Sequence, residues 1–116
     1  MGGTMERTLI VARMRPGSEQ NIASVFAASD ATDLPRRIGV QSRTLFRFHD
    51  LYMHLIEAEQ PLSATVDETR EDPLFREVSK NLQPFVAAYD PDTWRVPSDA
   101  MATAFYQWRS AQPEPR

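Results

Sequence analysis

The sequence predicts a single α+β domain whose elements follow the ferredoxin-like order β-α-β-β-α-β, and three observations predict it. A β-branched apolar segment opens the chain at residues 7–14. Two further strand-like segments, 39–48 and 51–58, are separated only by His49-Asp50, which is typical of a β-hairpin. Helical periodicity follows both the first strand and the hairpin. A length of 116 residues suits one domain, which we expect at residues 5–110.

The first helix is predicted from a break in the chain followed by a periodic apolar pattern. Pro16-Gly17-Ser18 ends the first strand, and Ser18 is a suitable N-cap. Asp33-Leu34-Pro35 should end the helix and lead into an extended segment. The side chains at i, i+3, i+4 and i+7 that make one face of this helix are Ile22, Val25, Phe26 and Ser29.

Prolines divide the second helical region into two helices. Pro61 opens a short helix that should stop before Pro73. Asp72 and Pro73 are a good N-cap and first-turn pair for a longer helix. Pro84 should bend or break that second helix, because proline removes a backbone donor. The apolar residues that keep helical spacing here are Leu74, Phe75, Val78, Leu82, Phe85, Val86 and Tyr89.

The C-terminal part of the chain is predicted to be a loop followed by a last strand. Residues 89–100 contain two prolines and three aspartates and are loop-like. The aromatic segment 103–109 is predicted to be the last strand of the sheet. We interpret residues 1–4 as a cloning remnant and residues 111–116 as a disordered tail.

The strand at residues 51–58 carries apolar side chains on both faces. Leu51, Met53 and Leu55 lie on one face, and Tyr52 and Ile56 lie on the other. Helices cover only one face of such a sheet, and an uncovered apolar face is costly. We therefore expect a homodimer, arranged as a dimeric α/β barrel, with a cavity between the two sheets or inside each monomer.

Composition excludes several classes of function. The net charge is −3 and no basic run occurs, so neither nucleic acid nor an anionic membrane is an expected partner. There is no cysteine, so thiolate chemistry and cysteine-ligated zinc are excluded. The sequence has no metal-ligand spacing, no G-x-G-x-x-G loop and no G-x-S-x-G motif. With no membrane-spanning stretch and no signal peptide, we expect a cytoplasmic protein.

Three titratable residues are candidates for chemistry. His54 lies within an apolar strand, where it is either a general base or a core histidine bonded to the backbone. Arg43 lies within the preceding strand and either stabilises a developing oxyanion or belongs to a solvated face. Asp30 lies at the C-terminal end of the first helix, where its charge opposes the helix dipole, and it either has a functional task or caps a turn. Arg47, His49 and Asp50 are interpreted as surface and turn residues.

Several aromatic residues are candidates for a binding wall. Trp94 lies in a polar loop, where it either packs on the domain surface or covers a pocket mouth. Tyr106 and Trp108 share one face of the predicted last strand and are expected to line an apolar cavity for a flat ligand. Tyr52 is expected to belong to the same apolar wall, and Phe26 and Ser29 of the first helix are further candidates for substrate binding.

Four stretches together resemble the TcmI-type (tetracenomycin-type) aromatic polyketide cyclases. They are GVQSRTLFRFHDLYMHLIEA at 39–58, DPLFREV at 72–78, DATDLP at 30–35 and AFYQW at 104–108. The likeness runs from about residue 7 to residue 108, and the stretch FRFHDLYMHLIEA is its most specific part.

The resemblance implies a dimeric, ferredoxin-like enzyme that uses no cofactor and no metal. Such cyclases close a late ring of an aromatic polyketide by intramolecular aldol chemistry and dehydration. The family's functional positions match Asp30, Arg43 and His54, whereas the histidine that the family often has before this aspartate is Ser29 here. On this resemblance His54 moves the proton, Arg43 holds the oxyanion, Asp30 orients or relays, and Ser29 donates a hydrogen bond to the substrate.

Two other functions fit the same features. One is a cofactor-free monooxygenase of anthrone-like polyketides, which would consume oxygen. The other is a non-catalytic partner that steers cyclisation by another enzyme of the polyketide synthase. The resemblance over residues 39–58 favours the cyclase.

Overall fold

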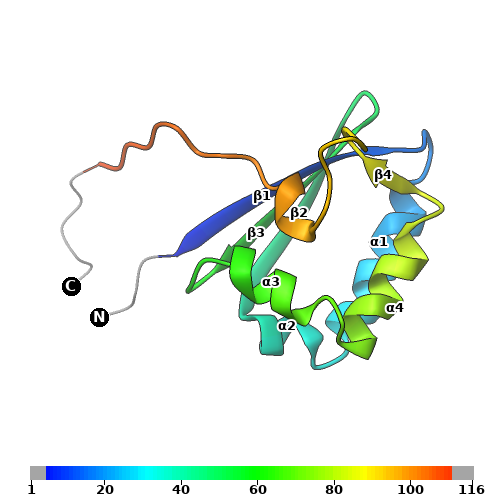
Figure 1. Cartoon of the computed structure of the whole chain (residues 1–116), viewed down its shortest axis with the longest axis horizontal. Helices are drawn as coiled ribbons and strands as arrows, with labels where there is room; N and C mark the ends of the chain where they lie inside the picture. The colour runs from blue at the N-terminus through cyan, green and yellow to red at the C-terminus, as the bar shows by residue number, and fades with distance from the viewer. Residues whose placement is uncertain (1–4, 111–116) are drawn as a thin grey trace.

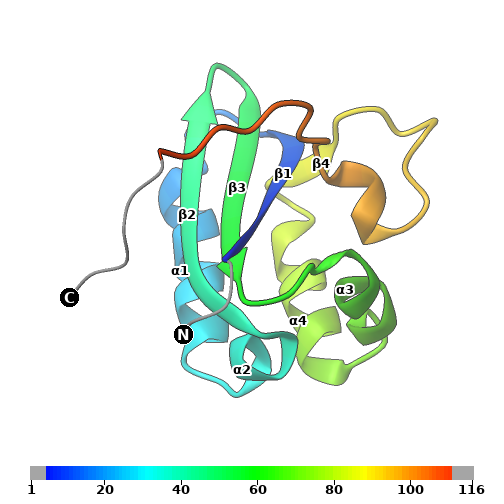
Figure 2. The ribbon, with the colours of Figure 1, turned by 90° about the vertical axis from the view of Figure 1, so that its left-hand side faces the viewer.

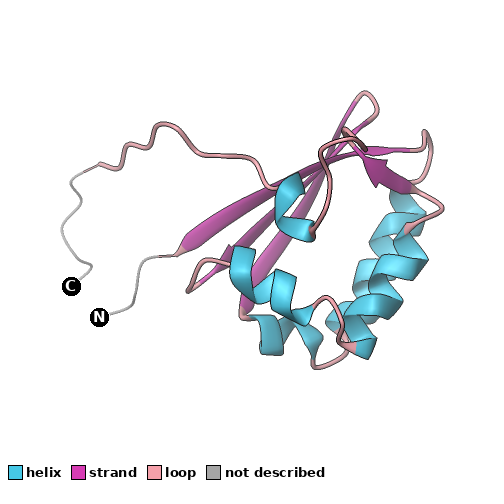
Figure 3. Ribbon diagram, viewed as in Figure 1, coloured by secondary structure: helices cyan, strands magenta, loops and turns pink. Residues whose placement is uncertain are grey.

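A four-stranded antiparallel sheet with helices packed on one face makes up the fold (Figure 1). This computed structural model describes residues 5–110. The strand order β2-β3-β1-β4 is that of a ferredoxin-like sheet, as the sequence predicted. Figure 3 shows the two layers, helices and sheet, by colour. The elements are β1 (Glu6–Met14), α1 (Glu19–Asp30), α2 (Leu34–Ile38), β2 (Val40–Phe48), β3 (Leu51–Ala58), α3 (Ser63–Thr69), α4 (Pro73–Leu82), β4 (Val86–Ala88) and the 3₁₀ helix η1 (Pro97–Ala100).

The β2–β3 hairpin is confirmed; β2 forms one edge of the sheet and β3 lies beside it in the centre. Phe48 pairs with Leu51, so His49 and Asp50 alone make the turn. His49 adopts a left-handed backbone conformation with φ of 57°, which a two-residue hairpin turn requires. The Asp50 carbonyl accepts a hydrogen bond of 2.8 Å from the Met14 amide, which joins the hairpin tip to the end of β1.

Strand β3 alternates strictly between the two faces of the sheet. Tyr52, His54, Ile56 and Ala58 are buried beneath the helices, whereas the residues between them are half-buried. Phe26 of α1 and Val66 of α3 pack against the inner face, and two core clusters result. The first cluster is Ala12, Met14, Ile22, Phe26 and Tyr52, and the second is Ile56, Ala58, Leu62 and Val66.

The two helices after the hairpin confirm the prediction that prolines divide this region into two helices. Helix α3 stops at Thr69, and α4 begins at Pro73 with Asp72 as N-cap. The Asp72 carboxylate accepts a hydrogen bond of 2.8 Å from the Leu74 amide, which satisfies one donor of the first turn. Helix α4 ends at Leu82, two residues before the proline that was expected to break it.

Three short elements were not predicted, and one of them, the 3₁₀ helix η1, lies within the segment 89–100 that was expected to be a loop. Leu34–Ile38 forms helix α2 rather than an extended segment, because Pro35 suits the first turn of a helix and Gly39 closes it with φ of 94°. Val86–Ala88 forms β4, which pairs with the end of β1. A three-residue strand is too short to show a period of two in the sequence, and these residues were assigned to the preceding helical pattern.

The predicted last strand at residues 103–109 is wrong for this chain. Met101 makes one bridge to Ile10, and the Ala102 amide donates to the Leu9 carbonyl at 2.7 Å; the segment then leaves the sheet (Figure 1). The place of a fourth strand beside β1 is taken by β4. The aromatic pattern suits a strand, but within the described residues segment 103–109 has no strand to pair with.

The face of the sheet opposite the helices is apolar and uncovered in this chain. Figure 2 looks onto it, with the C-terminal segment crossing in front. Phe46 and Phe48 are exposed there, and Leu9, Val11, Leu51, Met53 and Leu55 are half-buried. Within residues 5–110, no helix is long and apolar enough to cross a membrane. The expectations for residues 1–4 and 111–116 lie outside the described part of the chain.

Candidate active site

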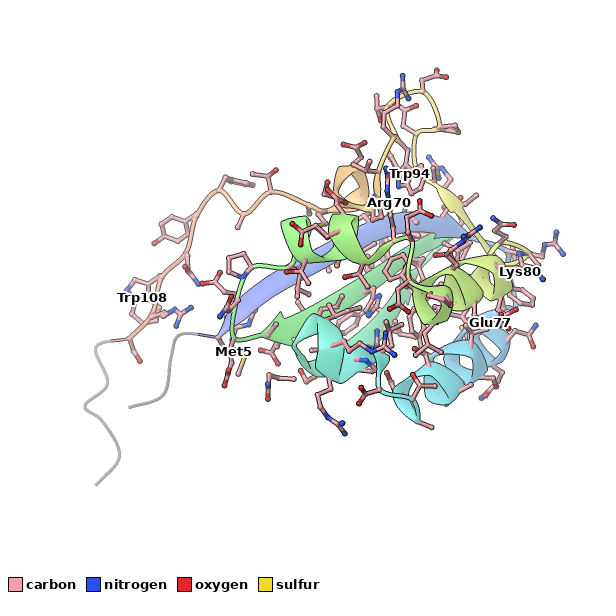
Figure 4. All side chains as sticks on the ribbon, turned by 60° about the horizontal axis from the view of Figure 1, so that its bottom comes forward. Met5, Arg70, Glu77, Lys80, Trp94 and Trp108 are labelled. Carbon is pink, nitrogen blue, oxygen red and sulfur yellow. The ribbon has the colours of Figure 1, made fainter. Side chains whose placement is uncertain are left out.

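A cavity of about 990 Å³ lies between the sheet and the helices, inside the monomer. Its inner wall comes from the four strands of the sheet, and its outer wall comes from α1, α2, α3 and α4. Trp94, in the segment between β4 and η1, is half-exposed and lines the cavity. Figure 4 shows Trp94 near Arg70, with Glu77 and Lys80 on α4; these exposed residues also line the cavity. The site can therefore hold a multi-ring ligand.

A continuous chain of hydrogen bonds joins the three catalytic candidates to Tyr52. Arg43 holds Asp30 with two bonds, from Nη2 to Oδ1 at 2.6 Å and from Nε to Oδ2 at 3.2 Å. Nη1 of Arg43 lies 3.0 Å from Nε2 of His54. On the other side of the imidazole, Nδ1 lies 3.1 Å from the hydroxyl of Tyr52. Arg43, His54 and Tyr52 all line the cavity.

The chemistry of arginine fixes the tautomer of His54. A guanidinium carries only donors, so the nitrogen that faces Arg43 must present a lone pair. Nε2 therefore accepts from Arg43, and in the neutral ring the proton resides on Nδ1. Nδ1–H then donates to the oxygen of Tyr52. In this series of hydrogen bonds Arg43 is only a donor, and His54 donates in turn to Tyr52.

Burial keeps both ring side chains neutral. Burial, reinforced by the positive charge of Arg43, lowers the pKa of His54 from 6.5 to about 3. Burial raises the pKa of Tyr52 well above its usual value, although the charge of Arg43 acts in the opposite direction. At neutral pH the site therefore holds one positive guanidinium and one negative carboxylate, with a neutral imidazole and a neutral phenol.

Local structure explains why Arg43 points inward. The two-residue turn sets the register of β2 on β3, so that Arg43 lies opposite Ile56 and shares the inner face with Leu45, which lies opposite His54. The guanidinium lies over the ring of Phe26, with Cζ 4.7 Å from the ring centroid. The same ring meets the edge of the His54 imidazole at a centroid distance of 4.8 Å. Phe26 thus packs beneath both groups.

The end of α1 places Asp30 and Ser29. The carbonyl of Ser29 accepts hydrogen bonds from the Thr32 hydroxyl at 2.6 Å and from the Thr32 amide at 2.9 Å, which turns the chain after the helix. Ser29 is buried and lines the cavity, and its hydroxyl has no partner among the described residues. The Asp30 side chain is 44% exposed and that of Arg43 only 14%, so this ion pair lies at the boundary between cavity and solvent.

The structure does not bring Tyr106 and Trp108 into this cavity. Their exposed fractions are 79% and 71%, and neighbouring Phe105 reaches 96%. The expectation that they line the pocket of their own chain is therefore corrected, because the strand that was to carry them does not form. Arg47 pairs with Glu19 at the surface at 2.6 Å, as a solvated residue should.

Sequence reasoning missed the polar role of Tyr52. It was assigned to an apolar wall, but its hydroxyl is hydrogen-bonded to His54. The signal was present, because residues two apart on a strand share a face. The contribution of Arg70, which follows α3 and lines the cavity, was also missed and has no distinct sequence signal. Among residues 5–110 no group of three or more His, Asp or Glu side chains could hold a metal ion.

Comparison with known proteins identifies the family. The family described as "Polyketide synthesis cyclase" matches residues 6–109. An uncharacterized protein of Streptomyces coelicolor is 52% identical over 90% of this chain and 95% of its own length. Polyketide synthase CurG of Streptomyces cyaneus is 45% identical over 90% of this chain and 97% of its own.

A solved structure agrees with these sequences. Tetracenomycin F2 cyclase of Streptomyces glaucescens, described as a type-II polyketide cyclase, is 44% identical over 88% of this chain and 93% of its own. Its crystal structure superimposes with a TM-score of 0.84, at 43% identity over 90% of this chain and 98% of that one. The ferredoxin-like fold and the resemblance found in the sequence are thereby confirmed, and the chain belongs to the polyketide synthesis cyclase family.

Proposed function

We propose that this polyketide cyclase closes a ring of an aromatic polyketide by intramolecular aldol addition followed by loss of water. The observation that carries the proposal is the guanidinium of Arg43 on the cavity wall. Of its five N–H groups, three are used in the bonds to Asp30 and His54, and two remain for an oxygen of the substrate. Arg43 is therefore a preorganised donor for a developing enolate.

In the proposed reaction a C–H bond between two carbonyl groups loses its proton, and the resulting carbanion carries its charge on an enolate oxygen. Arg43 stabilises that oxygen, which makes the proton easier to remove. The enolate carbon then attacks a second carbonyl, and one C–C bond forms. Protonation of the new alkoxide and loss of one water give the aromatic ring. No electron acceptor is needed, which supports a reaction without a cofactor.

His54 is the proposed proton acceptor, but its lone pair is occupied in the resting site. Nε2 receives an N–H from Arg43 at 3.0 Å, so it becomes free only when that guanidinium turns to the substrate oxygen. Binding of the substrate oxygen to Arg43 and freeing of the Nε2 lone pair of His54 then occur together. In the resting site Asp30 orients the guanidinium through two bonds.

The cavity supports the orienting role that such a reaction requires. A flexible polyketide has many unproductive conformers, and correct orientation is worth roughly 7–11 kcal/mol in favourable cases. Phe26 and Trp94 offer flat apolar surfaces for the rings, and Ser29 offers a free hydroxyl. We keep all three as proposed substrate-binding residues.

The test is product analysis with a reconstituted aromatic polyketide synthase, with and without this protein. A new product of equal mass, or lighter by one water, without oxygen uptake supports the proposal. Arg43→Ala and His54→Ala should abolish that product. Arg47→Ala is the matched control, because Arg47 lies on the same strand but pairs with Glu19 at the surface.

Other outcomes point to the alternatives. A product heavier by one oxygen, with oxygen consumed, would assign a monooxygenase instead. If the product distribution changes only when another synthase enzyme is present, the protein steers that enzyme through transient contact. Unchanged turnover in both Arg43→Ala and His54→Ala would refute the assignment of these catalytic residues.

We also propose that the protein acts as a cytoplasmic homodimer. The uncovered face of the sheet and the exposed aromatic residues of segment 103–109 both need a partner surface. A second copy supplies one, and Tyr106 and Trp108 would then reach substrate only within the dimer. Light scattering should give twice 13.2 kDa, and Met53→Glu, which puts a charge on that face, should give 13.2 kDa. A wild-type particle of 13.2 kDa at micromolar concentration would refute the dimer.

A further inference from the structure

We propose that Tyr52 is a catalytic residue whose hydroxyl donates its proton to the carbonyl oxygen that is attacked during ring closure. The inference rests on the proposed cyclase reaction and adds to it a second donor, separate from Arg43. It follows from the direction of the hydrogen bonds in the site, from the burial of the phenol and from its place on the cavity wall.

The direction of the bonds leaves the phenol proton without a partner. Arg43 can only donate, so the ring proton of His54 is on Nδ1. Nδ1–H donates a hydrogen bond of 3.1 Å to the Tyr52 oxygen. The hydroxyl proton of Tyr52 must then point elsewhere. Within residues 5–110, the Tyr52 hydroxyl makes no other hydrogen bond.

Burial makes that free donor significant. Tyr52 is only 4% exposed, and leaving a buried donor unsatisfied costs about 1–3 kcal/mol. Tyr52 lines the cavity, so an acceptor on the cavity's occupant can satisfy the hydroxyl. A ketone oxygen is such an acceptor, and a polyketide offers one at every second carbon.

The two donors act on different oxygens because His54 lies between them. Arg43 contacts one nitrogen of the ring and Tyr52 contacts the other. An aldol closure also has two oxygens that gain negative charge, the enolate oxygen of the nucleophile and the oxygen of the attacked carbonyl. Since Arg43 carries the full charge, it suits the enolate, and the neutral O–H of Tyr52 suits the oxygen that needs a proton.

The hydrogen bonds from His54 to Tyr52 allow a proton to move through the site without forming an imidazolium. In one concerted step, in which the enolate charge builds up only transiently, the C–H proton passes to Nε2 of His54, the Nδ1 proton passes to the Tyr52 oxygen, and the Tyr52 proton passes to the oxygen of the attacked carbonyl as the C–C bond forms. One C–H bond breaks, one C–C bond and one O–H bond form, and His54 ends as its other neutral tautomer. Exchange with water after product release restores the resting tautomer. The lowered pKa of His54 is compatible with this relay, because the ring stays neutral throughout.

The kinetic test is Tyr52→Phe, which removes the oxygen and keeps the ring. We expect kcat to fall about 10²–10³-fold, as for loss of one preorganised donor, with KM changed by less than about threefold. Tyr89→Phe is the matched control, since Tyr89 is exposed and stacks on Arg13 outside this cavity. If the wild type closes rings and Tyr52→Phe retains kcat within threefold, the inference fails while the cyclase proposal stands. If the wild type forms no ring, the cyclase proposal itself fails.

A second measurement does not depend on activity or on the folding of the variant. ¹⁵N NMR of the wild-type protein distinguishes a protonated ring nitrogen from an unprotonated one. We expect His54 to carry its proton on Nδ1 and to have an unprotonated Nε2 between pH 6 and 8. A proton on Nε2 would overturn the inference, because Tyr52 would then donate to Nδ1 and have no proton left for the substrate.

Discussion

The buried imidazole of His54 predicts a specific dependence of stability on pH. The folded state holds its pKa at about 3, against 6.5 for the free group. Between these values the unfolded chain binds a proton that the folded protein does not bind. Stability from this group is therefore fully present above pH 6.5 and is lost as the pH falls toward 3. The slope approaches about 1.4 kcal/mol per pH unit, which gives a loss of about 2 kcal/mol between pH 7.5 and pH 5.

Urea denaturation at pH 7.5, 6 and 5, followed by circular dichroism, measures this loss. His54→Gln is the matched variant, because glutamine cannot be protonated and still offers an acceptor to Arg43. The two depressed carboxyl pKa values, of Glu57 and Asp99, affect stability only at more acidic pH, since ordinary carboxyls titrate near 4. If wild type and His54→Gln lose equal stability between pH 7.5 and 5, His54 is not held neutral by burial and the reasoning is wrong.

Three further predictions concern activity and the helix that closes the cavity. Arg43→Lys should lower kcat about 10²-fold in the cyclisation assay, because a single ammonium cannot reproduce the two bonds to Asp30 together with the bond to His54; wild-type turnover would exclude the need for a fork of donors. The profile of kcat/KM should stay flat from pH 7.5 down to pH 5, whereas an acid limb near 6.5 would mean that His54 titrates as a free group. Asp72→Ala should destabilise the protein by about 1 kcal/mol in urea, through loss of the N-cap bond to Leu74 and the ion pair with Arg37, and an unchanged midpoint would contradict this.

The parts of the fold that the sequence predicted are those with a complete local pattern. Strand 51–58 is an eight-residue apolar segment bounded by a turn, so its existence was predicted, whereas its two apolar faces left open which one the helices bury. Helix α1 and the proline-bounded helices α3 and α4 likewise carry their own start and stop signals. Segment 103–109 has an equally good extended pattern, but strand pairing needs a neighbour, and only the tertiary structure shows that β4 already occupies the edge beside β1.

The sequence predicted which residues would form the candidate site, but not the hydrogen bonds that join them. Placing Arg43 and His54 on neighbouring strands follows from the hairpin, and the register that the two-residue turn sets puts both on the inner face. The approach of Asp30 depends on the turn after α1 and on α2, which was not predicted. The direction of the hydrogen bonds needs the two contacts of the imidazole at once, so it could not be derived from any single residue.

The charge balance of the site explains how it favours a reacting substrate over a resting one. Asp30 and Arg43 cancel, and His54 and Tyr52 are neutral, so a neutral polyketone can enter without leaving a buried charge unpaired. When negative charge develops on the substrate, Arg43 interacts with two anions, the substrate oxygen and the Asp30 carboxylate. Of the Asp30–Arg43 pair, Asp30 is the more exposed side chain. Water can stabilise Asp30 as that bond loosens, whereas the enolate inside the cavity has only the protein. The guanidinium therefore interacts more strongly with the transition state than with the ground state, and interactions of this differential kind accelerate a reaction.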